Sequence, residues 1–187
     1  MKRIRSKKLW AGTLAATAAA GLGLTLVTTA PADTERRGSP KTIRMVLTQG
    51  PLFNGPDTIA SGQNLRILNR TKVRDIGPHF FSIFTEDSLP TTNQEIRACA
   101  RIEFAPCENV AKAHNVSRTF NVRRRNVDRG ANGWDSAFTS ESQGDSWFTD
   151  EKRESETRTI SAEPGSTLYY ICIIHPQTMT GSIQVTD

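Results

Sequence analysis

Short runs of alternating apolar and polar residues recur along the chain and indicate β-strands. In Thr42–Thr48 the apolar residues Ile43, Met45 and Leu47 occupy alternate positions, so they share one face of a strand. Helical periodicity is weak outside the N-terminal region and the middle of the chain. The pattern predicts an all-β sandwich. Further strands are expected at 64–69, 80–85, 157–161, 168–173 and 181–185, with turns at Ser61-Gly62 and Pro164-Gly165.

The N-terminal region has the charge pattern of an export signal. Residues 1–8 carry five positive charges and no negative one, residues 9–27 are uncharged, and Ala30-Pro-Ala32 supplies small residues for cleavage. We therefore expect residues 1–32 to be a signal peptide, followed by a linker at 33–41. The alternative is an uncleaved membrane anchor, because the uncharged stretch nearly reaches a spanning length.

Removal of residues 1–32 changes the electrostatic picture. The whole chain has 24 basic and 19 acidic residues, and the five-charge excess lies entirely within those first residues. The remaining chain is formally neutral, so its charge gives no reason to expect a nucleic-acid partner. Its length suits one domain, which we place at 42–187.

Three cysteines in an exported chain leave one of them without an intramolecular partner. Cys99 and Cys107 are close in sequence and flank a short segment, so we expect a local disulfide between them. This pairing leaves Cys172 as the odd thiol, either as a metal ligand or as a buried free cysteine.

The residues around Cys172 favour the metal ligand. Cys172, His175 and Met179 lie within eight residues of one another, between two expected strands. A thiolate, an imidazole and a thioether together form a donor set that suits copper, and a second imidazole completes it. The other histidines are His79, at the start of an expected strand, and His114.

The C-terminal segment resembles the ligand loop of the cupredoxins, the blue copper proteins. The matching features are Tyr170-Ile-Cys172, His175-Pro176, Met179-Thr-Gly181 and Ile183-Gln-Val185, and the likeness covers 43–84 and 157–187. It implies a Greek-key β-sandwich holding one type 1 copper. The implied ligands are His79, Cys172, His175 and, as a weak axial ligand, Met179. An asparagine often braces the first histidine in this family, and Asn69 fills that role here only if 70–78 bulges out.

The middle of the chain, 86–156, is not explained by the resemblance and is expected to be a long insertion. A short helix is predicted within 93–110, held by the disulfide. Trp134 and Trp147 are expected to pack the insertion onto the sandwich. We expect Arg123–Arg125 to form a solvated loop and His114 to lie on the surface.

The resemblance implies a monomeric electron carrier rather than an enzyme, exported to the periplasm or the cell exterior. Its redox partner is expected to dock at an apolar patch near Ile174 and Pro176, with Phe53 as a weaker candidate. Two alternatives stay open: a copper-buffering or copper-delivery protein with the same ligands, and a metal-free binding module. A multicopper oxidase needs many more histidines than three.

Overall fold

The computed structural model describes residues 38–117, 120–130 and 133–187. The expected signal peptide, 1–32, and residues 33–37 of the expected linker lie outside these ranges. Within them, no helix combines the length and the apolar character needed to cross a membrane.

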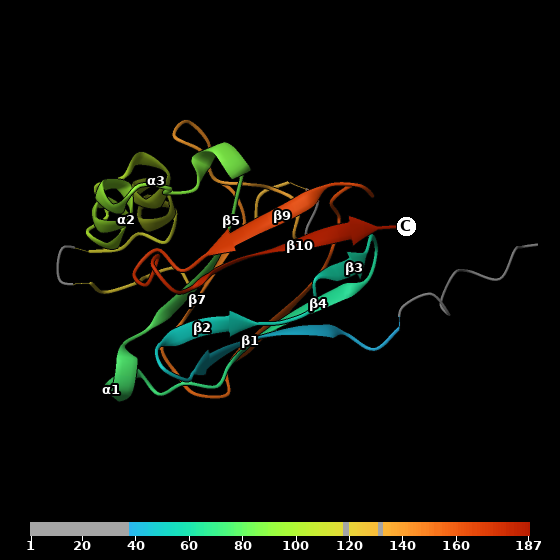
Figure 1. Cartoon of the computed structure of the whole chain (residues 1–187), viewed down its shortest axis with the longest axis horizontal. Coiled ribbons are helices and arrows are strands. Elements are labelled where there is room, and N and C mark those ends of the chain that lie inside the picture. The colour runs from blue at the N-terminus through green and yellow to red at the C-terminus, as the bar shows by residue number, and fades with distance from the viewer. Residues whose placement is uncertain (1–37, 118–119, 131–132) are drawn as a thin grey trace, which may run out of the picture. The chain divides into compact units, whose positions relative to one another are not determined.

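The strands of the described chain form two sheets around one hydrophobic core (Figure 1). The expected all-β sandwich is therefore confirmed. The first sheet has the order β2 (Pro51–Asn54), β1 (Lys41–Leu47), β4 (Asn64–Asn69), β8 (Ser155–Thr159). The second has the order β3 (Thr58–Ala60), β10 (Thr180–Thr186), β9 (Thr167–Ile171), β5 (His79–Phe84), β7 (Ser146–Thr149), β6 (Asn126–Val127).

The alternating pattern of β1 holds for only part of the strand. Ile43 and Met45 are fully buried, as expected, but Leu47 is 48% exposed. The pairing of β1 with β4 ends where Met45 lies opposite Asn69. Leu47 lies beyond the end of this pairing, at the end of β1, where it pairs with Pro51 of β2 alone.

Strand β5 is buried along its whole length, because both of its faces are covered. Phe81 points into the space between the sheets, where its ring lies 5.7 Å from that of Phe53 on β2. Phe80 points to the opposite face, as successive strand residues do, and lies 5.1 Å from the ring of His114. The insertion therefore covers the outer face of the second sheet.

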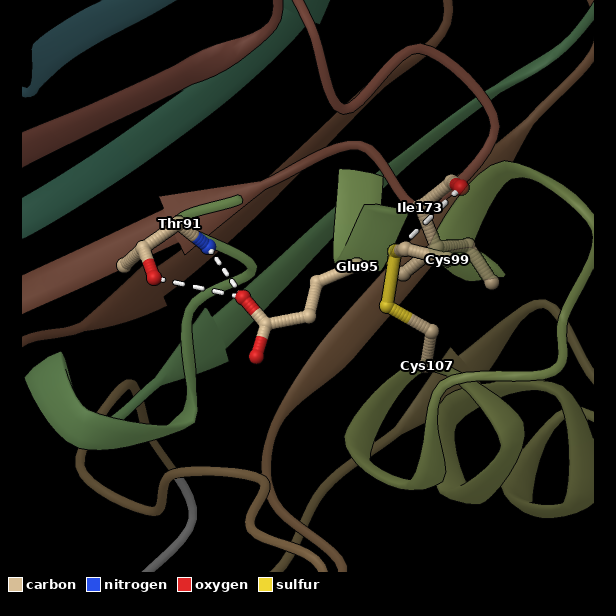
Figure 2. The surroundings of a disulfide bond; sticks show 5 residues. All are labelled: Thr91, Glu95, Cys99, Cys107 and Ile173. Carbon is tan, nitrogen blue, oxygen red and sulfur yellow. Dashed lines mark hydrogen bonds between the residues drawn. A yellow bond between two sulfur atoms is a disulfide. The ribbon is translucent and has the colours of Figure 1, made fainter. Parts of the chain in front are cut away.

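Two helices, α2 (Asn93–Ala100) and α3 (Ala105–Ala113), open the insertion after the 3-10 turn η1 (Glu86–Ser88). A capping box starts α2: Thr92 accepts from the Glu95 backbone, and the Glu95 carboxylate accepts from the Thr92 backbone. A disulfide joins Cys99 of α2 to Cys107 of α3 and leaves Cys172 free, which confirms the expected pairing (Figure 2). One short helix was expected here, and two are present.

The sandwich resumes inside the segment that was expected to be insertion. Strand β7 runs antiparallel to β5, with Thr149 opposite His79, and β8 begins at Ser155. Strand β6, at Asn126–Val127, already pairs with β7, so strands of the sandwich occur well inside the expected insertion. Trp134 and Trp147 are both buried, with Trp147 in β7 and Trp134 edge-on to Phe81.

The expectation that His114 lies on the surface is wrong. Its side chain is fully buried at the C-terminal end of α3. One ring nitrogen lies 2.8 Å from Ser146 Oγ of β7, and the other is hydrogen-bonded to the Arg124 carbonyl. His114 thus connects the helices of the insertion to the second sheet. The polar sequence around His114 suggested exposure. Its two hydrogen-bond partners lie 10 and 32 residues further along the chain, so the neighbouring residues do not reveal that it is covered.

Burial lowers the pKa of His114 to about 4, against the ordinary 6.5, although its hydrogen bond to the Arg124 backbone opposes the shift. Below pH 6.5 the unfolded chain takes up this proton and the folded chain does not. We expect metal-free protein to lose about 1.4 kcal/mol of unfolding free energy per pH unit on this account. The loss should run from pH 6.5 down to about 4.

Urea unfolding at several pH values checks this expectation, with His114→Gln as the comparison. The variant should be less stable near neutral pH and should show a shallower decline on acidification. Equal slopes in the two proteins would mean that His114 does not carry the pH dependence.

Candidate metal centre

Three side chains from two distant parts of the sequence meet at one end of the sandwich. The potential ligand atoms of His79, Cys172 and His175 all lie within 4.8 Å of one another. His79 begins β5, whereas Cys172 and His175 lie in the loop between β9 and β10, and the two imidazole rings are 5.0 Å apart. The expected equatorial set is therefore brought together.

Cys172 presents a fully buried sulfur to this site. Its Sγ lies 3.5 Å from Nδ1 of His175 and accepts a hydrogen bond from the Phe80 backbone N–H at 3.3 Å. Burial raises the pKa of Cys172 to about 11, and the backbone N–H groups oppose this rise. Without a metal the group is a thiol at neutral pH, so metal capture must displace a proton.

The imidazole of His79 is oriented through its outer nitrogen. Nε2 lies 2.7 Å from Thr71 Oγ1, and that hydroxyl donates to Asn69 Oδ1 at 2.6 Å. A hydroxyl has one proton, so Thr71 accepts from Nε2–H of His79. This assignment leaves Nδ1 unprotonated. Nδ1 is buried and has no hydrogen-bond partner among the described residues.

The Asn69 amide is held from its other side as well. Its Nδ2 donates to the Glu151 carbonyl at 3.0 Å and to Thr149 Oγ1 at 3.3 Å, which fixes Oδ1 toward Thr71. Between Asn69 and His79 the chain makes the short helix α1 (Val73–Ile76) at the edge of the molecule (Figure 1). The expected bracing by Asn69 is therefore present, and it acts through Thr71.

His175 is half-buried, so it is the most accessible of the three clustered side chains. Burial lowers its pKa, and a hydrogen bond with the Ile76 backbone opposes that shift. Burial, and then the neighbouring His175, lower the pKa of His79 to about 4. Both imidazoles are therefore neutral near pH 7, the form in which histidine binds metals.

Met179 closes the loop between β9 and β10, residues 172–179, which we call the ligand loop. The Cys172 N–H donates to the Met179 carbonyl at 2.9 Å, and the Met179 N–H donates to the His175 carbonyl at 2.9 Å. The Met179 side chain is fully buried. Its role as the axial ligand stays a prediction.

The expected apolar patch is only partly as predicted. Ile174 is half-exposed, whereas Pro176 is buried and Phe53 packs its ring into the core against Tyr170 and Phe81. Pro51 and Ile96, which the sequence did not single out, lie beside the ligand loop instead.

The sequence analysis also missed Thr71, whose only signal in the sequence is its position two residues after Asn69.

The donor set fits a copper site. One thiolate and two neutral imidazoles form the soft-and-intermediate combination that copper selects. The orphaned Nδ1 of His79 is the strongest sign of a missing partner, because a buried polar atom in a native fold is normally satisfied. A second cluster, Asp150, Glu151 and Glu154, carries no such sign, because Arg125 forms ion pairs with two of its carboxylates.

Comparison with known proteins gives matches in structure only. No protein-family model and no curated protein matches the sequence. Auracyanin A, a "blue" copper protein from Chloroflexus aurantiacus, is 14% identical with a TM-score of 0.39, covering 79% of this chain and 100% of its own. Auracyanin B is 15% identical with a TM-score of 0.40, covering 78% and 87%. Reduced auracyanin from Roseiflexus castenholzii is 14% identical with a TM-score of 0.36, covering 80% and 100%.

The fold is cupredoxin-like. The two sheets of this chain, together with the His79, Cys172 and His175 side chains gathered at their end, bear out the expected resemblance.

The hydrogen-bond chain behind His79 gives a test of the centre. Thr71→Val removes the hydroxyl at nearly constant volume and releases Nε2 of His79, so we expect copper affinity to fall by about 10- to 100-fold. Thr71→Ser keeps the hydroxyl and should bind within a few-fold of wild type. Competition with a chelator measures both affinities. If Thr71→Val binds copper as tightly as Thr71→Ser, the orientation of His79 does not depend on this hydroxyl.

Proposed function

We propose that this protein is an exported type 1 copper protein that carries single electrons between redox partners. The observation that carries this proposal is the unpartnered Nδ1 of His79, buried beside the sulfur of Cys172 and the ring of His175. His79, Cys172 and His175 would hold the ion, with Met179 as the weak fourth ligand. The bound ion would supply a one-electron Cu(II)/Cu(I) couple.

The surrounding residues favour a site that changes little during electron transfer. The Phe80 N–H holds the sulfur, Thr71 holds His79, and the loop hydrogen bonds hold the backbone of His175. Ligands fixed in advance need little rearrangement when the charge of the site changes. His175 alone of the clustered ligands reaches toward solvent, so its ring edge is the expected route for electrons.

Copper buffering or delivery is the rival proposal. A delivery protein must pass its ion to a receiver through ligands that an incoming group can approach. Cys172, His79 and Met179 are each 0% exposed, which works against such an exchange. A metal-free binding module has no need of the assembled and braced ligand set.

Export is proposed from the charge pattern of residues 1–32 and is supported by the disulfide. Bonds such as Cys99–Cys107 persist in oxidising compartments and are rare in the cytosol. A periplasmic or extracellular location follows for the mature protein, and we propose that it acts as a monomer.

Copper titration tests the proposed site type. Purified protein given Cu(II) should develop an intense visible band from the thiolate, and electron paramagnetic resonance should show narrow hyperfine splitting. Cys172→Ser should abolish the band, because that sulfur is part of the chromophore. Met179→Leu should stay coloured, with a raised reduction potential. If the two variants lose copper equally, Met179 is not a weak axial ligand.

Histidine substitutions separate the proposed ligand from the structural histidine. His79→Ala should open a position that added imidazole refills, restoring the visible spectrum. His114→Gln is the matched control, and it should leave the spectrum and potential unchanged. A spectral change from His114→Gln with none from His79→Ala would assign the second imidazole to the insertion.

A further inference from the structure

A small pocket of about 260 Å³ lies directly beside His175. The ligand loop forms one wall with Ile174, His175 and Pro176. Helix α2 of the insertion forms another with Ile96, Arg97 and Ala100, which share one helix face by their spacing. The long insertion thus reaches the half-buried ligand of the proposed copper centre.

The disulfide holds α2 against the ligand loop. Cys99 is fully buried, and its Sγ lies 3.6 Å from the carbonyl oxygen of Ile173, next to Cys172 in sequence (Figure 2). A disulfide sulfur has no proton, so this approach is a packing contact rather than a hydrogen bond. Because Cys99 lies between Arg97 and Ala100, the contact sets which face of α2 meets the pocket.

The pocket has one charged wall residue, and its sign is positive. Arg97 is exposed and makes no ion pair with any described residue, and no carboxylate lines the pocket. The acidic groups nearest to it in sequence are engaged elsewhere: Glu95 caps α2, and Glu103 pairs with Arg101. Arg97 is therefore available to an incoming anion.

The other side of His175 is also cationic. The segment that reaches His175 through the Ile76 backbone carries Arg70, Lys72 and Arg74, against the single carboxylate Asp75, which pairs with Arg74. Three basic residues against one carboxylate give this segment a net positive charge, the same sign as Arg97 in the α2 wall of the pocket. Such a field favours encounter with a negatively charged partner.

The size of the pocket indicates what occupies it. Pockets for drug-sized ligands begin near about 300 Å³, so this one suits a protruding side chain better than a free cofactor. The complementary surface is an apolar side chain with a carboxylate beside it. We propose that α2 of the insertion forms half of a docking surface for an acidic redox protein, with Arg97 as the residue that binds the partner's carboxylate. This inference rests on the proposed function.

An inert paramagnetic anion tests the surface without copper. Hexacyanochromate(III) added to metal-free, isotope-labelled protein should broaden the amide signals of Ile96, Arg97, Ala100 and Gln177 in a two-dimensional NMR spectrum. Hexaamminechromium(III), the matched cation, should not. Arg97→Glu should remove most of the broadening by the anion. Lys41→Glu makes the same change in net charge on β1 opposite Leu65, away from the Asn69 end, and should leave the broadening in place.

A kinetic arm connects the surface to electron transfer. At low salt, Arg97→Glu should slow reduction of the copper-loaded protein by the anionic iron(II)–EDTA complex by about three- to ten-fold. Lys41→Glu should change that rate by less than about two-fold. Equal slowing by both variants would mean that only net charge matters, and it would overturn the proposal.

The copper spectrum and the NMR experiment distinguish failure of the proposed function from failure of the proposed docking surface. Absence of a blue copper spectrum would refute the proposed function, while the NMR arm would still judge the surface. Broadening centred on Arg70 and Lys72, or broadening that Arg97→Glu leaves unchanged, would refute the role of α2.

Discussion

The pairing register of β5 with β9 is the constraint on which the site depends. Ser82 lies opposite Ile171, so β5 runs past the end of β9 to Phe80 and His79 where the chain continues into Cys172. The Phe80 N–H consequently reaches the Cys172 sulfur, and the neighbouring His79 reaches the same space. A slip of one residue would turn these side chains to the opposite face and separate the ligands.

The two sheets are also joined at this end by a polar contact. Asn69 ends β4 of the first sheet, and its amide donates to Thr149 of β7 in the second. The same amide orients Thr71, and through it His79. Because these groups are buried, removal of one would leave another unsatisfied at a cost of about 1–3 kcal/mol. The ligand geometry and the closure of the sandwich thus share one hydrogen-bond network.

The insertion contributes to both the core and the proposed centre. His114 lies against Phe80 and binds Ser146, so one residue covers β5 while fixing β7. Cys99 touches the carbonyl of Ile173, next to the sulfur ligand. A segment that the family resemblance does not explain therefore contacts Phe80, which binds the Cys172 sulfur, and Ile173, which follows Cys172 in sequence. These contacts give the insertion a physical role in shaping access to His175.

The amino-acid sequence alone indicated six of the ten strands in the described chain, the odd cysteine and the spacing of Cys172, His175 and Met179. Alternation and loop spacing are properties of neighbouring residues, and cysteine parity is a count over the chain, so none of them depends on how the chain packs. The sequence could not place Thr71, Ile96 or Arg97 at the site, nor bury His114. Those positions depend on which segments meet after folding: β7 returns from within the insertion, and α2 is held against the ligand loop. Contacts between residues far apart in the chain are decided by packing of the two sheets and the disulfide-linked helices, and no local pattern encodes them.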